Sequence, residues 1–320
     1  MSKLKKKYDA TITLAKTIHN KKLYSLKRRK EYEWEGTEVE QRMSNLFRAR
    51  DYQKMLSAVE NFLEVHPTCC MMLKLKADLL RRTGQLENVE EILRKAYDLS
   101  AINSWQRADI GIALGQYYLF HFRLEDALKH LTESERILEE IPGKYSRYGY
   151  CLNCIAKVYR EKGKLESAEF YCKKSIPVFQ FAQDFYKQAY SYRLLARIEI
   201  PKFHDCSPKV RKYSKYYGEY CILLASIIEQ LPWYSNDYVQ DSVEAKTAMY
   251  RGEFLFAIGD LVNARKDLRS SLELAITQSK KTNKKNPTMC RVYRKLADID
   301  VIDNNAKEAI QNFLEAKNVL

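Results

Sequence analysis

The sequence predicts an all-α protein built from about six or seven stacked helix pairs. Three observations lead to this fold class. Ten Gly and seven Pro among 320 residues are too few for the turns of a β-rich fold. Small residues recur in pairs, twelve positions apart, along most of the chain. A glycine that suits the end of a helix often follows seven positions after the first small residue of a pair.

The composition restricts the class of protein. A hydrophobic content of 46% with 30% charged residues fits a folded, soluble chain. No apolar run approaches the ~18 residues of a membrane span. The N-terminus is basic and lacks the apolar stretch of a secretory signal, and eight cysteines without such a signal indicate free thiols in a reducing compartment. We therefore expect an intracellular protein, cytoplasmic or nuclear.

The formal net charge of +14 is unevenly distributed. Residues 1–30 hold eleven Lys/Arg and one acid, and residues 262–296 hold ten Lys/Arg and two acids. Residues 84–140 have the opposite balance, with six basic and eleven acidic residues. This distribution indicates localised electrostatic contacts rather than a uniformly basic surface.

The twelve-residue spacing predicts which helices pair. Two antiparallel helices approach to 8–10 Å only where both carry a small or slim residue at the crossing point. The pairs are Ala77 with Val89, Gly115 with Ala127, Ala156 with Ala168, Gly252 with Ala264, and Ala297 with Ala309. Ala168, in the stretch "REKGKLESAEFYCKKSI", therefore marks the point where the second helix of its pair crosses the first.

Other positions keep the same register. The turn glycines are Gly84, Gly163 and Gly259, and Phe122 and Asn304 replace them in the other two pairs. Three positions after the first small residue an inward apolar side chain is expected at Leu80, Tyr118, Tyr159 and Leu255, and Asp300 breaks this pattern. Sixteen positions after it, inward side chains are expected at Leu93, Leu131, Cys172, Leu268 and Phe313.

This pattern resembles the tetratricopeptide repeat (TPR), and "YREKGKLESAEFYCKKS" and "LFAIGDLVNARKDLRSSLEL" carry it best. The resemblance implies a right-handed superhelical solenoid of helix pairs over residues 37–320. The first small residues fall at 77, 115, 156, 196, 252 and 297, so the repeats are longer than the 34 residues of the family. Pro201 and Pro208 predict that "IPKFHDCSPK" is a loop and that the repeat around 189–232 is disrupted.

Residues 1–36 form a separate segment in this interpretation. Their apolar residues follow a helical period, which favours a helix that caps the first repeat. The alternative is a contact arm. Its basic cluster is Lys21, Lys22, Lys27, Arg28, Arg29 and Lys30. Such a cluster fits a nuclear-localisation signal or a phosphate-contacting strip, and equally a solvated basic helix end.

No catalytic constellation is recognisable. The five histidines lack metal-ligand spacing, and the chain contains no phosphate-binding or nucleophile motif. Cys151 and Cys154 form a CxxC, but it lies inside an expected helix without the turn that zinc geometry needs. We interpret these cysteines as core residues. The sequence therefore predicts a non-enzymatic protein without a metal or cofactor.

The first helices of the repeats are expected to line a concave groove. Positions −6, −3, +1, +4 and +5 relative to the first small residue should face inward and combine basic, amide and tyrosine side chains. The candidate partner-binding residues are Lys74, Arg81, Tyr150, Asn153, Lys157, Arg160, Tyr190, Arg193, Arg197, Lys246, Arg291 and Arg294. Arginine and tyrosine in a groove suit an acidic peptide, or a phosphate backbone with stacked bases.

Two functions remain open from the sequence. The first is an interaction scaffold that holds an acidic or helical protein segment in a partly basic groove, as part of a multiprotein complex. The alternative is an RNA- or DNA-binding solenoid that uses the same groove and the basic N-terminal arm. The repeats reach Leu320 without a polar helix after them. Because solenoid ends need a cap, we expect a partner or further chain to cover that end.

Overall fold

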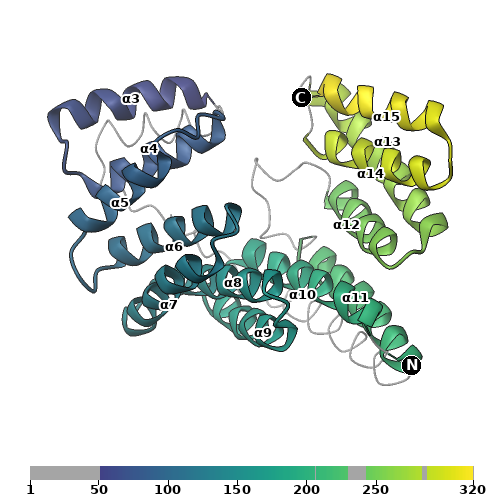
Figure 1. Ribbon diagram of the computed structural model, residues 1–320, viewed down its shortest axis with the longest axis horizontal. Helices are drawn as coiled ribbons and strands as arrows, with labels where there is room; N and C mark the ends of the chain where they lie inside the picture. Colours follow the sequence, from purple (N-terminus) through teal and green to yellow (C-terminus); the bar gives the residue numbers. More distant parts are fainter. Residues whose placement is uncertain (1–50, 206, 230–242, 283–286, 320) are drawn as a thin grey trace, which may run out of the picture. The chain divides into compact units, whose positions relative to one another are not determined.

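The computed structural model describes residues 51–205, 207–229, 243–282 and 287–319, in which every regular element is an α-helix. The helices α3 to α15 follow one another along this part of the chain (Figure 1). The chain divides after Ala182 into two compact units. We call them the N-terminal unit, with α3 to α9, and the C-terminal unit, with α10 to α15.

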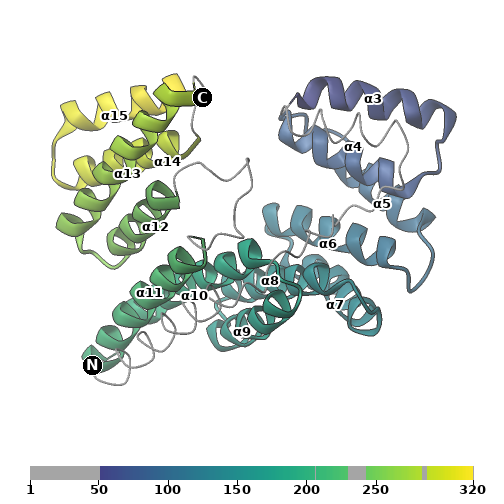
Figure 2. The same ribbon diagram turned by 180° about the vertical axis from the view of Figure 1, so that it is seen from behind.

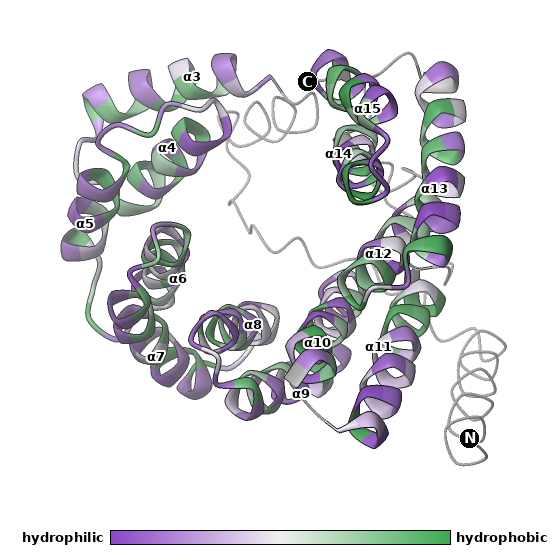
Figure 3. Cartoon of the chain, turned by 45° about the vertical axis from the view of Figure 1, so that its right-hand side comes forward, coloured by the Kyte–Doolittle hydropathy of each residue, from purple (hydrophilic) through white to green (hydrophobic). Residues whose placement is uncertain are grey.

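Within its described residues, the N-terminal unit consists of helix α3 followed by three helix pairs. Its helices are α3 (Tyr52–Val65), α4 (Cys70–Arg82), α5 (Val89–Leu99), α6 (Trp105–Phe120), α7 (Leu124–Glu140), α8 (Tyr145–Glu161) and α9 (Leu165–Phe181). The pairs are α4–α5, α6–α7 and α8–α9. We call the first helix of a pair the A helix and the second the B helix. The A helices α4, α6 and α8 form one layer and the B helices a second (Figure 3).

The C-terminal unit repeats this arrangement with longer helices. It contains α10 (Phe185–Asp205), α11 (Pro208–Glu229), α12 (Val243–Ala257), α13 (Leu261–Thr282), α14 (Pro287–Ile302) and α15 (Ala306–Val319). The pairs are α10–α11, α12–α13 and α14–α15. In α10–α11 the two helices lie side by side along most of their length (Figures 1 and 2). The fold is thus an all-α repeat solenoid, as the sequence predicts.

The register of the small residues is confirmed. Each first small residue lies in an A helix, and each twelve-residue partner lies in the B helix of the same pair. Ala168 is fully buried, as are Ala77, Ala127 and Ala264. The approach is closest at the glycines: a Cβ on Gly115 would lie 2.5 Å from Cγ of Leu131, and one on Gly252 would lie 2.8 Å from Cγ of Leu268. The small residues therefore set the distance between paired helices.

In five of the helix pairs, the turn between the two helices has the same backbone conformation. Gly84, Gly163 and Gly259 have φ of +78°, +72° and +85°, which is the left-handed region. Phe122 and Asn304, which stand where the other pairs have glycine, adopt the same conformation with φ of 56° and 57°. Helices commonly end this way because a residue with positive φ lets the backbone N–H groups that follow reach the last carbonyls.

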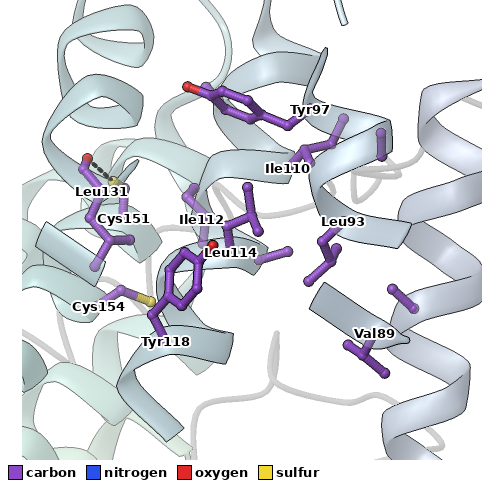
Figure 4. Packing of buried hydrophobic residues seen from close by; sticks show 14 of the residues in the cluster. Val89, Leu93, Tyr97, Ile110, Ile112, Leu114, Tyr118, Leu131, Cys151 and Cys154 are labelled. Atoms are coloured by element: carbon purple, nitrogen blue, oxygen red, sulfur yellow. Dashed lines mark hydrogen bonds between the residues drawn. The ribbon is translucent and has the colours of Figure 1, made fainter. Parts of the chain in front are cut away.

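The core of the N-terminal unit is a continuous apolar cluster between the two layers. Leu93 on α5, Ile110 and Leu114 on α6, and Leu131 on α7 are almost fully buried within it (Figure 4). Cys151 belongs to the same cluster, and its thiol donates a hydrogen bond of 3.3 Å to the Leu131 carbonyl. This hydrogen bond joins two successive helix pairs.

The expected loop at "IPKFHDCSPK" is wrong. Helix α10 continues through Pro201 to Asp205, and α11 begins at Pro208. Pro201 lies in the last turn of α10, where it removes one helical hydrogen bond and the helix ends four residues later. Pro208 takes the first position of a helix, where a missing N–H costs little. The prolines therefore fit the ends of two long helices instead of interrupting the repeat.

The last pair departs from the pattern at two positions. Asp300, where other repeats have an apolar residue, is buried and forms an ion pair with Arg265. It also accepts a hydrogen bond of 2.7 Å from Asn312. Phe313, expected to face inward, is 45% exposed and lies beside the exposed Leu314.

The basic N-terminal segment is not part of the described structure. Residues 1–36, with the basic cluster at 21–30, lie outside the described residues, so the choice between a cap and a contact arm stays a prediction.

Candidate interaction site

A charge ladder joins the A helices of the N-terminal unit. The Asp109 carboxylate on α6 lies 3.0 Å from Lys74 Nζ on α4 and 2.7 Å from the Arg147 guanidinium on α8. Asp109 is 2% exposed, and the Lys74 side chain is 11% exposed. The ladder neutralises a buried carboxylate from both sides. Lys74 therefore ties successive repeats together instead of lining a solvent-filled groove.

Two other predicted site residues of this unit are held inside the repeat. Asn153 on α8 is fully buried, and its side-chain oxygen accepts a hydrogen bond of 2.9 Å from Ser175 Oγ on α9. Tyr150 is half-buried and accepts a hydrogen bond from the Gln116 amide on α6. Asn153 is thus an interhelical packing residue, which corrects the expectation that it faces a partner.

Among the predicted basic site residues of the N-terminal unit, Arg81, Lys157 and Arg160 remain accessible. The Arg81 side chain is 37% exposed and lies 3.9 Å from Asp78. Lys157 and Arg160 are half-buried on α8, and Arg160 forms an ion pair with Glu161. This unit therefore retains only scattered positive charge on its A helices.

A different arrangement occurs in the C-terminal unit. The Tyr250 ring on α12 lies between two arginines, with Arg193 Cζ of α10 at 4.8 Å and Arg291 Cζ of α14 at 5.2 Å from its centroid. Arginine over a tyrosine ring is a favourable cation–π geometry. Arg291 also forms an ion pair with Glu253 of α12. Three successive A helices thus meet around one aromatic ring.

Burial and charge determine how these arginines behave. Burial alone would lower the pKa of Arg291, but the Glu253 carboxylate outweighs it and the pKa is raised overall, so the guanidinium stays charged. Arg193 is only 6% exposed. Its burial against Tyr250 corrects the expectation of a solvated groove residue. Arg193 is therefore a buried packing partner of Tyr250 and presents little of its own surface to a ligand.

The exposed positive charge lies one turn from this stack. Arg197 on α10 and Arg294 on α14 are exposed, and Lys246 on α12 is half-buried. Tyr190 is half-buried one turn before Arg193. We call the surface of Arg193, Arg197, Lys246, Arg291 and Arg294 around Tyr250 the arginine face.

One predicted cluster stays untested. Lys157 and Arg160 belong to the N-terminal unit, whereas Arg193 and Arg197 belong to the C-terminal unit. The structure describes each unit by itself, so a common ligand for these four residues remains a prediction.

Two central residues were missing from the sequence prediction. Arg147 and Tyr250 lie nine and two positions before the small residue of their helices, outside the positions expected to face inward. The signal for Arg147 was Asp109, an acid at an expected inward-facing position of the preceding repeat. A buried carboxylate needs a cationic partner, and one lysine does not saturate it.

The cysteines are packing residues, as predicted. Cys151, Cys154 and Cys172 are fully buried. Burial raises the pKa of the Cys151 and Cys154 thiols, which disfavours the reactive thiolate. Among the described residues, no group of three or more His, Cys, Asp or Glu side chains is placed to hold a metal ion. The helices of this part of the chain include none that is long and apolar enough to cross a lipid bilayer.

Comparison with known proteins identifies the repeat type. The family model of the fifth ARM-repeat domain of TT21 matches residues 42–139. A tetratricopeptide repeat protein from Parabacteroides merdae superposes with a TM-score of 0.56 at 14% identity, covering 88% of this chain and 92% of that one. The chain has the fold of a divergent TPR/ARM-like helical-repeat protein.

A second solved structure agrees. BtubC (BKLC) from P. vanneervenii superposes on this TPR/ARM-like chain with a TM-score of 0.52 at 15% identity, covering 76% of this chain and 93% of that one. No curated protein matches the sequence. At these identities the likeness defines the fold alone.

Proposed function

We propose that this protein is a non-enzymatic interaction scaffold whose arginine face binds an acidic segment of a partner protein. The observation that carries the proposal is Tyr250 held between Arg193 and Arg291, with the exposed Arg197 and Arg294 one turn away. The buried stack fixes the helices, and Arg197 and Arg294 expose positive charge to solvent beside it. Arginine suits this role because its planar fork binds a carboxylate through two hydrogen bonds.

The burial data decide which residues to change. Arg193→Glu would place a carboxylate at a 6% exposed position against Tyr250, so it would perturb folding as well as binding. Arg197→Glu with Arg294→Glu reverses charge only at exposed positions. Surface substitutions of this kind change stability by no more than about 0.5 kcal/mol.

A matched control is available in the same unit. Arg269→Glu with Lys307→Glu makes the same change in net charge at exposed positions of α13 and α15, away from the arginine face. Wild type and both double variants are purified from native cells with their partners, and bound proteins are quantified by mass spectrometry. We expect proteins that bind wild type and the control but not Arg197→Glu/Arg294→Glu. Identical sets for all three would contradict the proposal.

Nucleic-acid binding is the alternative function. Glu253 pairs with Arg291 at the edge of the arginine face, and Asp298 pairs with Lys295 on α14. A continuous phosphate backbone would therefore meet carboxylates as well as arginines. Titration of labelled RNA and DNA at several salt concentrations tests this class directly. Phosphate contacts predict a logarithmic salt slope near −0.9 per phosphate on duplex DNA. Tight binding with a steep slope, lost in Arg197→Glu/Arg294→Glu, would favour the alternative.

The role of the basic N-terminal segment needs a test of its own. We propose that residues 1–36 cap the first repeat. If they do, a chain that begins after residue 36 should aggregate in light scattering because apolar surface becomes exposed. A truncated chain that stays soluble and helical would instead support the contact arm.

A further inference from the structure

A groove of about 820 Å³ lies in the C-terminal unit, lined by α11, α12 and α13. Helix α11 contributes most of its lining, α12 contributes Thr247, Arg251 and Leu255, and α13 contributes its first turns. We call it the α11 groove. None of its lining residues belongs to the arginine face. The α11 groove is therefore a second surface, and a ligand that binds there need not contact the arginine face.

Exposed aromatic surface lies along α11. Tyr213 is 55% exposed and Tyr216 is 41% exposed, and both line the groove. The Tyr213 ring stacks on Tyr217 with a centroid distance of 5.7 Å and an interplanar angle of 12°. Leu223 is also exposed in the groove. Because stacking restrains Tyr213, the groove offers a preformed apolar surface to a large side chain.

The charges that line the groove are not balanced. Lys215 lies 3.0 Å from Asp260, and the Arg251 guanidinium lies 2.6 Å from Asp267, so these two carboxylates already have partners. The groove also contains three exposed lysines. They are Lys209, Lys212 and Lys266.

These three lysines are available to a ligand. The structure records no ion pair for any of them within the residues that it describes. Hydrophilic residues dominate the first half of α11, where Lys209 and Lys212 lie (Figure 3). A lysine ammonium presents three donors and no acceptor, so a negatively charged ligand complements it.

The third carboxylate of the groove, Glu219, is half-buried. Burial raises the pKa of Glu219, and the nearby Lys215 and Arg251 only partly offset that effect. Glu219 therefore takes up a proton more readily than an ordinary glutamate. The groove combines an apolar wall, three unpaired lysines and three carboxylates of which two are paired.

We propose that the α11 groove binds an acidic segment of a partner protein that carries an aromatic or large aliphatic side chain. The acidic residues would meet Lys209, Lys212 and Lys266, and the apolar side chain would pack on Tyr213 and Tyr216. A nucleic-acid strand fits less well because its unbroken phosphate charge would face Asp260, Asp267 and Glu219. A protein segment places its charges and its apolar group at separate positions.

Short random peptides displayed on phage and selected on the full chain test this proposal. We expect the selected peptides to be rich in Asp and Glu around a Phe, Trp, Tyr, Leu or Met. Their affinity for Lys209→Glu/Lys212→Glu should fall at least about tenfold because reversed charges repel the ligand. Tyr213→Ala should cost about fivefold, whereas Tyr213→Phe keeps the ring and should bind like wild type.

Matched variants separate this site from the arginine face. Arg197→Glu/Arg294→Glu and Arg269→Glu/Lys307→Glu should both retain the peptides, and circular dichroism should show unchanged helix content in every variant. Loss of the peptides in Arg197→Glu/Arg294→Glu alone would assign them to the arginine face and overturn the groove proposal.

Three other results would also overturn it. The first is full affinity of the peptides for Lys209→Glu/Lys212→Glu. The second is binding of single-stranded RNA that is lost in the same variant while acidic peptides do not bind. The third is peptide binding that occurs only after residues 1–50 are removed, which would make that segment the occupant of the groove.

Discussion

The Arg147 guanidinium on α8 lies 2.7 Å from the Asp109 carboxylate on α6, and Asp109 is 2% exposed. Lys74 on α4 approaches the same carboxylate from the preceding repeat, at 3.0 Å. One buried acid therefore links three successive A helices. Removing it would take this carboxylate away from both cations, and of the two Lys74 keeps a second carboxylate, Asp78, at 3.4 Å.

We predict that Asp109→Ala destabilises the protein by about 3–5 kcal/mol, the usual cost of leaving a buried charge without its partner. Asp98→Ala removes an exposed carboxylate from α5 and should change stability by less than about 0.5 kcal/mol. Urea unfolding of both variants gives the comparison. Similar stabilities would show that the ladder contributes little.

The contact between Gly115 and Leu131 leads to a packing prediction. A Cβ at Gly115 would lie 2.5 Å from Cγ of Leu131, so in Gly115→Ala either the Leu131 side chain or the paired helices must shift. We expect a loss of about 1–3 kcal/mol, typical of overpacking.

The double variant provides the test of mechanism. Leu131→Ala removes the atoms that the new methyl group would meet. Gly115→Ala should therefore cost less in a Leu131→Ala background than in the wild type, as measured by a double-mutant cycle. Strictly additive costs would mean that Gly115 matters for another reason.

The turn residue Phe122 leads to a stabilising prediction. Its φ is 56°, and its side chain is 76% exposed, so the ring contributes little packing against the left-handed strain. That strain costs a non-glycine residue roughly 1–2 kcal/mol, and glycine loses about 0.5–1 kcal/mol more backbone entropy on folding. Phe122→Gly should therefore raise stability by about 0.5–1 kcal/mol.

The reverse substitution at an equivalent turn serves as control. Gly163 has a φ of +72°, so Gly163→Ala should destabilise the protein by about 1 kcal/mol. Thermal unfolding of both variants should show shifts of opposite sign. Shifts of the same sign would contradict the conformational explanation.

The helix pairs were predictable because crossing points are local. Two helices joined by a short turn can approach only at residues such as Ala156 and Ala168, and their spacing is visible in the chain itself. Phe122 and Asn304 also occupy the predicted turn positions, although neither is a glycine. The prediction of a loop at Pro201 was wrong because the effect of a proline is not determined locally. Whether a proline ends a helix or occupies its last turn depends on the length of the neighbouring helix.

The candidate site was only partly predictable. Periodicity placed Arg193 and Arg291 on the correct helices, but it does not show whether a side chain at a given position faces solvent or the adjacent A helix. That choice depends on the distance between repeats. Lys74, Asn153 and Arg193 proved buried for this reason. The α11 groove escaped prediction because its lining comes from three helices of two different repeats.

The last prediction concerns pH and His130 on α7. Its ring stacks on Tyr118 at a centroid distance of 5.6 Å and meets the Tyr97 ring edge to face at 5.1 Å. Burial lowers the pKa of His130 below the ordinary 6.5, and the neighbouring Lys129 and Arg94 act in the same direction. Glu133 and Asp126 oppose them and raise the pKa, but they do not outweigh burial. The folded chain therefore holds this imidazole neutral.

The sign of the effect follows from proton linkage. Above pH 6.5 the imidazole is neutral in both the folded and the unfolded chain, so it does not change stability. As the pH falls below 6.5, the unfolded chain binds the proton first, and the free energy of unfolding decreases until the pH passes the folded pKa. The nearby Glu90 and Glu133 have lowered pKa values, so their loss of stability begins only below the ordinary 4.5. We therefore expect wild type to lose stability between about pH 7 and pH 5.5, and His130→Phe, which keeps a ring without the titrating group, to lose less. Equal losses in urea unfolding at these two pH values would exclude His130 as the source.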